Sequence, residues 1–245
     1  MQICIDAGHN YSGTDTGVVG VNGLKEQDIT FSIAEQLKNK LTSNGHEVIM
    51  TRNNLTDNLG RDVASSLTER VRISNNWGSD FFISIHCNSG TPTANGTEVL
   101  IPGRGGLAES YAESVQRAIC NRLGTMDRGV RVDTEYLNTR LYVLHNTTCP
   151  AILIEAGFLT NAQDAEKLAT RPDDFAVAIA SAFGSISGTS RFTDIDGHWA
   201  QIHIEKLEAY GIINGFDDGT FRPDETVTRA QAAAMVSNAL SVLGK

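Results

Sequence analysis

The stretch Asp80-Phe81-Phe82-Ile83-Ser84-Ile85-His86 is a nearly continuous apolar run of strand length. Such a run is typical of a sheet that is covered on both faces, because a strand with one solvated face alternates apolar and polar residues. Ala151-Ile152-Leu153-Ile154-Glu155 is a second run of the same kind. Together the two runs predict the buried centre of a sheet.

Extended and helical patterns alternate on either side of these runs. Further strands are expected at residues 2–6, 48–50 and 97–101, and helices at 26–43, 67–76, 107–123 and 163–183. Strands that alternate with helices indicate an α/β fold. We therefore predict a covered, largely parallel or mixed twisted sheet flanked by helices.

The composition of the chain changes after residue 183. Residues 184–191 are mostly glycine, serine and threonine, which is typical of a flexible linker. Residues 192–245 hold two helical segments around a glycine-rich turn, so we expect a small all-α module there. The predicted domains are thus 1–183, which carries the catalytic site, and 192–245.

Charge and composition exclude several classes of partner. The net charge of the 245 residues is −9 and no basic stripe is present, so we expect no nucleic-acid partner. No apolar segment is long enough to span a bilayer, and no membrane partner is expected. The four cysteines match neither a zinc-site spacing nor a compact disulfide framework, which favours buried free thiols.

The N-terminus lacks the basic and apolar regions of a secretion signal, because Met1 leads directly into a short strand pattern. We expect the protein to be made in the bacterial cytoplasm without a signal peptide. The alternative is that a signal has been removed from the chain.

Several side chains with catalytic potential lie at element ends. His9, His86 and Glu155 lie at or just after predicted strand ends, where α/β folds form their ligand crevices. Glu26 begins a predicted helix. Zinc hydrolases commonly use three ligands from histidine, glutamate and aspartate. A carboxylate that ends a strand as apolar as that of Glu155 is costly unless it is paired, metal-bound or catalytic.

Each of these residues also has a structural interpretation when it is taken alone. A histidine at a strand end is often simply hydrogen-bonded. Glu26 is favoured at a helix N-terminus by the helix dipole, and Glu155 could pair with an arginine. Spacing does not decide, because no HExxH motif is present.

Four motifs in order resemble the signatures of the zinc-dependent N-acetylmuramoyl-L-alanine amidases. Ile5-Asp6-Ala7-Gly8-His9 resembles the opening signature, and Gly23-Leu24-Lys25-Glu26 follows it before the first helix. Leu67-Thr68-Glu69-Arg70, continuing to Phe82–Asn88, resembles the central signature, and Pro150–Asn161 the closing one. The resemblance covers residues 2 to about 183.

The resemblance implies one Zn²⁺ per chain, with His9, Glu26 and His86 as its ligands. It also implies that Glu155 is the catalytic general base and acid. The expected substrate is peptidoglycan, and the expected reaction is hydrolysis of the amide between N-acetylmuramic acid and L-alanine by zinc-activated water.

Three further residues lie close to these motifs or between them. Asn88 and His145 are candidates for the substrate groove, although a structural role fits each as well. Cys87 stands where the family has a small residue. Because adjacent strand residues point to opposite faces, we expect its thiol to point away from a metal bound by His86.

The C-terminal segment resembles one S-layer homology repeat, from Phe192 to Leu240. The matching stretches are Phe192–Ala200, Gly211–Gly215, Asp218–Pro223 and Thr228–Gln231. The resemblance implies binding to secondary cell-wall polysaccharide, with Trp199 stacking on a sugar and Arg229 pairing with an anionic group. The alternative for Trp199 is a core position.

Such repeats usually occur in threes, whereas this chain has one. We therefore expect a homo-oligomer formed through the repeat. The alternative is that the repeat packs on its own amidase domain.

Three functions are compatible with these observations. The first is a wall amidase with an anchor, the second a zinc peptidoglycan carboxypeptidase, and the third a wall-binding protein with an inactive catalytic domain. Occupation of all four metal and catalytic positions favours an enzyme. A phage or prophage endolysin, released to the wall by a holin-type membrane hole, is the expected biological role. A host mother-cell or autolytic amidase is the alternative.

Overall fold

In the computed structural model of the chain, residues 1–184, 192–195, 198, 200, 204–205, 207–208 and 210–243 are described. They form two compact units, one that ends with helix α7 and one that contains helix α9. Each unit is described by itself. Within the described ranges, no helix combines the length and the hydropathy that a bilayer-spanning segment needs.

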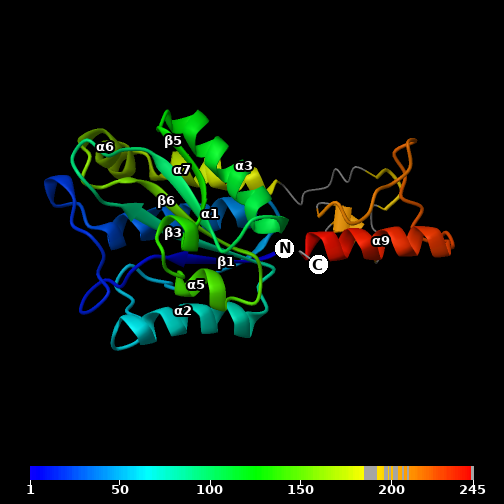
Figure 1. Cartoon of the computed structure of the whole chain (residues 1–245), viewed down its shortest axis with the longest axis horizontal. Coiled ribbons are helices and arrows are strands. Elements are labelled where there is room, and N and C mark those ends of the chain that lie inside the picture. The colour runs from blue at the N-terminus through cyan, green and yellow to red at the C-terminus, as the bar shows by residue number, and fades with distance from the viewer. Residues whose placement is uncertain are drawn as a thin grey trace. The chain divides into compact units, whose positions relative to one another are not determined.

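The larger unit is built on a six-stranded sheet with the strand order β2-β1-β3-β6-β4-β5 (Figure 1). The strands are β1 (Gln2–Ala7), β2 (Glu47–Met50), β3 (Phe81–Asn88), β4 (Thr97–Ile101), β5 (Asp127–Val132) and β6 (Ala151–Phe158). All neighbouring strands are parallel except β4 and β6, which pair antiparallel. The predicted α/β fold with a largely parallel, mixed sheet is confirmed.

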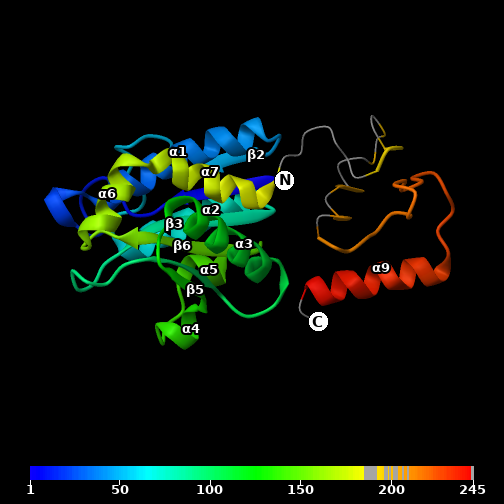
Figure 2. The ribbon, with the colours of Figure 1, turned by 90° about the horizontal axis from the view of Figure 1, so that it is seen from above.

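Helices cover both faces of this sheet, as Figures 1 and 2 show. One face carries α1 (Glu26–Ser43), α3 (Gly106–Leu123) and α7 (Pro172–Phe183), and the other carries α2 (Val63–Trp77) and α5 (Tyr142–Asn146). The shorter elements are η1 (Val21–Gly23), α4 (Asp133–Tyr136) and α6 (Ala162–Thr170). Because both faces are covered, the central strands β3 and β6 are almost entirely buried.

Local sequence signals set the ends of α2. The Asp62 carboxylate accepts a hydrogen bond from the Ser65 amide, while the Ser65 hydroxyl lies within hydrogen-bonding distance of the Asp62 amide. This reciprocal cap satisfies two amides that have no partner within the helix. At the other end, Gly78 adopts a left-handed φ of 76°, which glycine accommodates without steric cost.

The sequence did not indicate β5, α4 or α5. The strand β5 reads Asp-Arg-Gly-Val-Arg-Val, so it lacks an apolar run and lies at the edge of the sheet. The helices α4 and α5 have four and five residues, which is too short for a helical periodicity to show.

A buried polar network supports the carboxyl end of β1. Arg70 of α2 donates to the carboxylate of Asp6 at 2.7 Å, and Thr51 and Ser84 donate to the same carboxylate. Burial alone would raise the pKa of Asp6, but the charge of Arg70 and these hydrogen bonds outweigh it and hold that pKa below its usual range. Arg70 also donates to the carbonyl of Ala7, which fixes the strand end that leads to His9.

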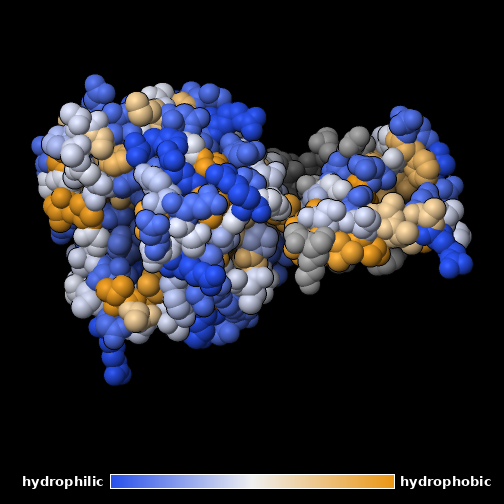
Figure 3. Space-filling model, viewed as in Figure 1, coloured by the Kyte–Doolittle hydropathy of each residue, from blue (hydrophilic) through white to orange (hydrophobic). Residues whose placement is uncertain are grey.

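The C-terminal unit contains α9 (Arg229–Val242) and a small cluster of buried apolar residues. The cluster comprises Phe192, Ile195, Ile204 and Ile213. Of the two predicted helical segments, the second is α9, whereas the first extends over residues outside the described ones. None of the residues of α9 is buried within the unit, and Figure 3 shows hydrophobic residues gathered along it.

Candidate metal centre

Three residues with metal-ligating side chains meet at the carboxyl ends of β1 and β3. His9 follows β1, His86 lies near the end of β3, and Glu26 is the first residue of α1. Glu26 Oε1 lies 3.0 Å from His9 Nε2 and 3.2 Å from His86 Nδ1. Ligands of a tetrahedral zinc ion at about 2.05 Å are separated by about 3.3 Å. The three side chains are therefore spaced as the ligands of one metal ion would be.

Glu26 is held in place by backbone donors as well as by the histidines. The amides of Val18 and Cys87 each donate to its carboxylate at 3.0 Å, and the residue is 3% exposed. Burial would raise the pKa of Glu26, but hydrogen bonds from His86 and His9 outweigh it and hold that pKa far below its usual range. An ionised carboxylate between two imidazoles is a suitable set of donors for a divalent cation.

The second ring nitrogen of His9 is bound by Asp15, at 3.0 Å between Nδ1 and Oδ1. The other oxygen of Asp15 accepts from Ser66 and lies 3.8 Å from Arg70. Burial opposes protonation of His9, but its bonds to Asp15 and Glu26 outweigh burial and raise its pKa to about 9. A carboxylate behind a ligating histidine fixes the orientation and tautomer of the ring and makes it a better ligand.

The backbone approaches this centre closely at two glycines. A Cβ at Gly17 would lie 2.7 Å from His9 Cδ2 and 2.8 Å from Glu26 Oε2. A Cβ at Gly8 would lie 2.6 Å from His86 Cε1. Since both contacts are far below van der Waals distance, any larger residue would displace a ligating side chain.

Glu155 lies beside the centre, because it pairs directly with His86 across β3 and β6. Its Oε2 atom is buried and has no hydrogen-bond partner among the described residues. Burial, followed by the charges of Glu26 and Glu98, raises the pKa of Glu155 to about 8. The charge of a carboxylate in such surroundings is costly unless positive charge or hydrogen-bond donors offset it. A cation held by the neighbouring ligands would supply that charge, so these residues fit a metal ion.

The two candidate groove residues lie in different places. Asn88 shares a face of β3 with His86 and donates to Glu98 at 2.7 Å. His145 is bonded instead to Asp133, which follows β5. Because β4 and β5 run antiparallel to β6, their carboxyl ends lie at the amino end of β6. The structure therefore places His145 at the opposite end of the strands from His86.

Cys87 contributes its amide rather than its thiol to the centre. Its side chain is buried on the sheet face opposite to that of His86, and burial raises the pKa of the thiol well above its usual value. Among the described residues, the group able to hold a metal consists of His9, Glu26 and His86 and does not include Cys87.

Two residues that support the site, Asp15 and Glu98, are not among the candidates that the sequence indicates. Asp15 lies between two threonines in a polar loop, where a carboxylate carries no distinguishing signal. Glu98 did carry such a signal, because it is a carboxylate in the short buried strand β4, next to the apolar residues 99–101. The argument applied to Glu155 from its apolar strand applies equally to Glu98.

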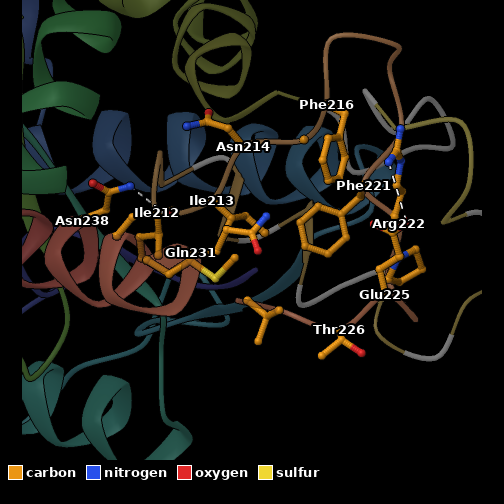
Figure 4. Close-up of a pocket in the computed structure, with 15 residues that line it drawn as sticks. Ile212, Ile213, Asn214, Phe216, Phe221, Arg222, Glu225, Thr226, Gln231 and Asn238 are labelled. Atoms are coloured by element: carbon orange, nitrogen blue, oxygen red, sulfur yellow. Dashed lines mark hydrogen bonds and ion pairs between the residues drawn. The ribbon is translucent and has the colours of Figure 1, made fainter. Parts of the chain in front are cut away.

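The C-terminal unit has a separate cavity of about 510 Å³ between α9 and the preceding loop, drawn in Figure 4. Phe216 and Phe221 line one part of it, where Arg222 stacks on the Phe216 ring at 4.0 Å. On the side of α9, Gln231 and Asn238 face the cavity, and Asn238 donates to the Ile212 carbonyl. The cavity is thus lined by aromatic and polar side chains together.

Of the two residues expected to bind wall polymer, the structure describes Arg229 but not Trp199. Arg229 is exposed at the first turn of α9 and is not among the residues that line the cavity. Trp199 lies outside the described residues, so its stacking on a sugar stays a prediction.

A mostly parallel α/β sheet with two imidazoles and a carboxylate at one rim defines a candidate metallohydrolase. The family model described as N-acetylmuramoyl-L-alanine amidase matches residues 3–184, and the chain belongs to this family. It is therefore a cell-wall enzyme that hydrolyses the bond between N-acetylmuramic acid and L-alanine. A second model, the S-layer homology domain, matches residues 191–233 and implies binding to cell-wall polymer.

Known proteins show the same relationship. The chain is 31% identical over 210 residues to the N-acetylmuramoyl-L-alanine amidase CwlM of Bacillus licheniformis, covering 86% of this chain and 76% of that protein. It is 32% identical to the endolysin of Bacillus phage SPP1, covering 68% and 58%. The solved structure of the amidase AmiC2 of Nostoc punctiforme aligns with a TM-score of 0.64 at 32% identity, covering 74% and 94%.

These findings decide between the functions that the sequence left open. The amidase prediction is confirmed, and the carboxypeptidase and the inactive wall-binding protein are set aside. The relatives include both a bacterial enzyme and a phage endolysin, so they leave the biological origin undecided.

Proposed function

We propose that the chain is a zinc amidase in which His9, Glu26 and His86 hold one Zn²⁺ and Glu155 transfers the protons. The observation that carries this proposal is the meeting of three ligand atoms, all within 4.8 Å of one another, beside the carboxyl of Glu155. When bound, zinc lowers the pKa of water towards about 7 and polarises a carbonyl group.

The residues of the chain would then act in sequence on the scissile amide. Glu155 accepts a proton from the attacking water as the water oxygen bonds to the lactyl carbonyl carbon. Glu155 then delivers that proton to the amide nitrogen as the C–N bond to L-alanine breaks, so the same carboxyl serves first as base and later as acid. Asp15 keeps the His9 ring oriented throughout, and Arg70 holds the loop behind it.

The products of the reaction provide the direct test. Purified sacculi are incubated with the protein, with and without a chelator, and the fragments are identified by mass. We expect new N-terminal L-alanine and glycan strands freed of their stems, and we expect neither product to form with the chelator. A product with a shortened stem that is still attached to the glycan would contradict the proposal.

Substitution of Asp15 tests how the ligands are oriented. Removal of the carboxylate behind a ligating histidine typically weakens metal binding by about 10–100-fold. We expect Asp15→Ala to do the same here, because His9 would lose the bond that fixes its ring. Zinc affinity is measured by competition with a chromophoric chelator, and the exposed Asp173→Ala on α7 is the matched control. Unchanged affinity in Asp15→Ala would remove Asp15 from the account.

The C-terminal unit is proposed to bind secondary cell-wall polysaccharide as part of a homo-oligomer. An exposed apolar row on α9 supports association, since Val236, Leu240 and Leu243 are 60%, 44% and 71% exposed. Copies brought together in this way would bind a polymer multivalently. Light scattering of the full chain should give a mass above one chain that falls in Leu240→Glu. A single-chain mass at every concentration would contradict the proposal.

We also propose an endolysin role, supported by the likeness to a phage endolysin. Expression in a Gram-positive host should then cause lysis only after the membrane is permeabilised. Lysis or wall turnover in cells with intact membranes would favour a host enzyme, either autolytic or active in the mother cell.

A further inference from the structure

The edge strand β5 carries an irregularity next to the proposed catalytic carboxyl. Thr97 pairs with Asp127 and Val99 with Val130, so Glu98 alone faces the two residues Arg128 and Gly129. This extra residue is a β-bulge, and Gly129 takes a φ of 86° that glycine allows. Bulges are common beside active sites, where they change the direction in which side chains point.

The bulge brings two arginines to one place. Arg128 and Arg131 are three residues apart and would point to opposite faces of a regular strand. Instead both reach the same carboxylate oxygen, since Glu98 Oε2 lies 3.1 Å from Arg128 Nε and 3.5 Å from Arg131 Nε. The two guanidinium groups therefore lie on one face of the sheet.

That face is the one that carries the proposed catalytic residues. His86 pairs with Glu155 across β3 and β6, and Glu155 pairs with Glu98 across β6 and β4. Directly paired residues point to the same face, so the three side chains form a row across neighbouring strands. Strands are about 4.8 Å apart, which puts the backbone of Arg128 on β5 roughly 10 Å from that of Glu155. The arginines extend the row beyond Glu155.

The charges of this group do not balance. Glu98 is the one carboxylate within ion-pair distance of either arginine among the described residues. Its side chain is 2% exposed, whereas those of Arg128 and Arg131 are 25% and 39% exposed. The two arginines therefore carry one positive charge more than Glu98 neutralises, and both side chains are partly exposed to solvent. Arg131 Nε is buried and has no hydrogen-bond partner among the described residues, so its 3.5 Å approach to Glu98 is an ion pair without a hydrogen bond.

Aromatic rings hold both guanidinium groups in place. Arg128 stacks on Phe158 at 4.9 Å and donates to the Tyr136 hydroxyl, while Arg131 stacks on the Tyr136 ring at 4.6 Å. A guanidinium group fixed in this way loses little conformational freedom on binding, and its planar fork matches a carboxylate.

We propose that Arg131, supported by Arg128, binds a carboxylate of the peptide stem and so fixes the direction in which the substrate crosses Glu155. This inference rests on the proposed role of Glu155 at the scissile amide. At that bond the lactyl carboxyl is already an amide, so the nearby glycan is neutral and the negative charges of the substrate belong to its peptide.

The distance selects which carboxylate is bound. The guanidinium group of Arg131 lies beside Glu98, one strand from Glu155. An extended peptide advances about 3.3 Å per residue, so a group roughly two residues from the scissile nitrogen lies within reach of that guanidinium group. The second residue of the stem is linked through its side chain and keeps a free α-carboxylate unless that group is amidated. The amidated form would offer no charge to Arg131.

Two soluble substrates that differ in this group alone test the inference. Both are disaccharide tripeptides ending in lysine, one with D-isoglutamate and the other with D-isoglutamine as the second stem residue. The zinc-loaded full chain should favour the isoglutamate substrate. Arg131→Ala should lower kcat/KM on that substrate by about 10–100-fold, mainly through KM, and leave the isoglutamine substrate within about threefold.

Controls separate this role from a structural one. Arg117→Ala, an exposed arginine on α3, should change neither substrate. Arg131→Lys keeps the positive charge but lacks the planar guanidinium group, so it should recover part of the preference for the isoglutamate substrate. If circular dichroism shows that Arg131→Ala is unfolded, Arg131→Lys takes its place in the test. Equal losses on both substrates, or no loss on either, would overturn the inference. If the wild type cleaves neither substrate, the proposed function itself fails.

Discussion

Glu155→Gln is expected to lower kcat on purified sacculi by about 10²–10⁴-fold while the zinc content stays unchanged. Glutamine has the same shape but cannot accept the proton of water or return it to the leaving amine. The loss should be confined to kcat, because Glu155 does not touch the three ligand atoms and its neighbours His86 and Glu98 remain in place.

The stability of this variant should equal or exceed that of the wild type. In the absence of metal the Oε2 atom of Glu155 is buried and has no partner among the described residues, and the raised pKa of the carboxyl reflects the cost of its charge. A neutral amide avoids that cost. Glu166→Gln, at an exposed position of α6, is the matched control and should retain full activity. Turnover of Glu155→Gln within a factor of a few of the wild type would remove Glu155 from the mechanism.

Glu26→Ala is expected to abolish both zinc binding and activity. Glu26 lies between the two histidines and is the one carboxylate of the ligand set, so its loss leaves two imidazoles alone. Removal of a residue behind the ligands typically lowers metal affinity by about 10–100-fold. Removal of the ligand Glu26 should lower zinc affinity by more than that. Part of the effect is structural, because the amides of Val18 and Cys87 lose their acceptor.

Zinc titration at rising concentration separates the metal effect from misfolding. A folded Glu26→Ala that regains neither metal nor activity behaves as expected, and its circular dichroism spectrum should match that of the wild type. Glu35→Ala, an exposed position of the same helix, should bind zinc normally. Full zinc occupancy in Glu26→Ala at wild-type affinity would show that the ligand set is wrong.

The sequence predicts the centre of the fold better than its edge. The runs that form β3 and β6 are apolar on both faces, and α1 has clear helical spacing, so the sequence predicts α1 to the residue and the two strands to within three residues. The edge strand β5 is charged and irregular, and its bulge arises from pairing with β4. Such pairing depends on residues distant in sequence, so no local pattern could show it.

The same division applies to the site. His9, His86 and Glu155 were recognised because they end strands, and the structure brings them to one rim together with Glu26. Asp15 was not recognised because its role depends on a loop that folds back onto His9. His145, for which a groove role and a structural role fitted the sequence equally, lies at the far end of the sheet from His86 because β4 and β6 pair antiparallel, and that pairing leaves no trace in the sequence.

The central claim of this account is that His9, Glu26 and His86 together bind one metal ion. Elemental analysis of the freshly purified full chain and of His86→Ala tests it most directly. We expect one zinc per chain in the wild type and almost none in the variant, with both proteins folded. A metal-free wild type that stays active, or a variant that keeps its zinc, would contradict the claim.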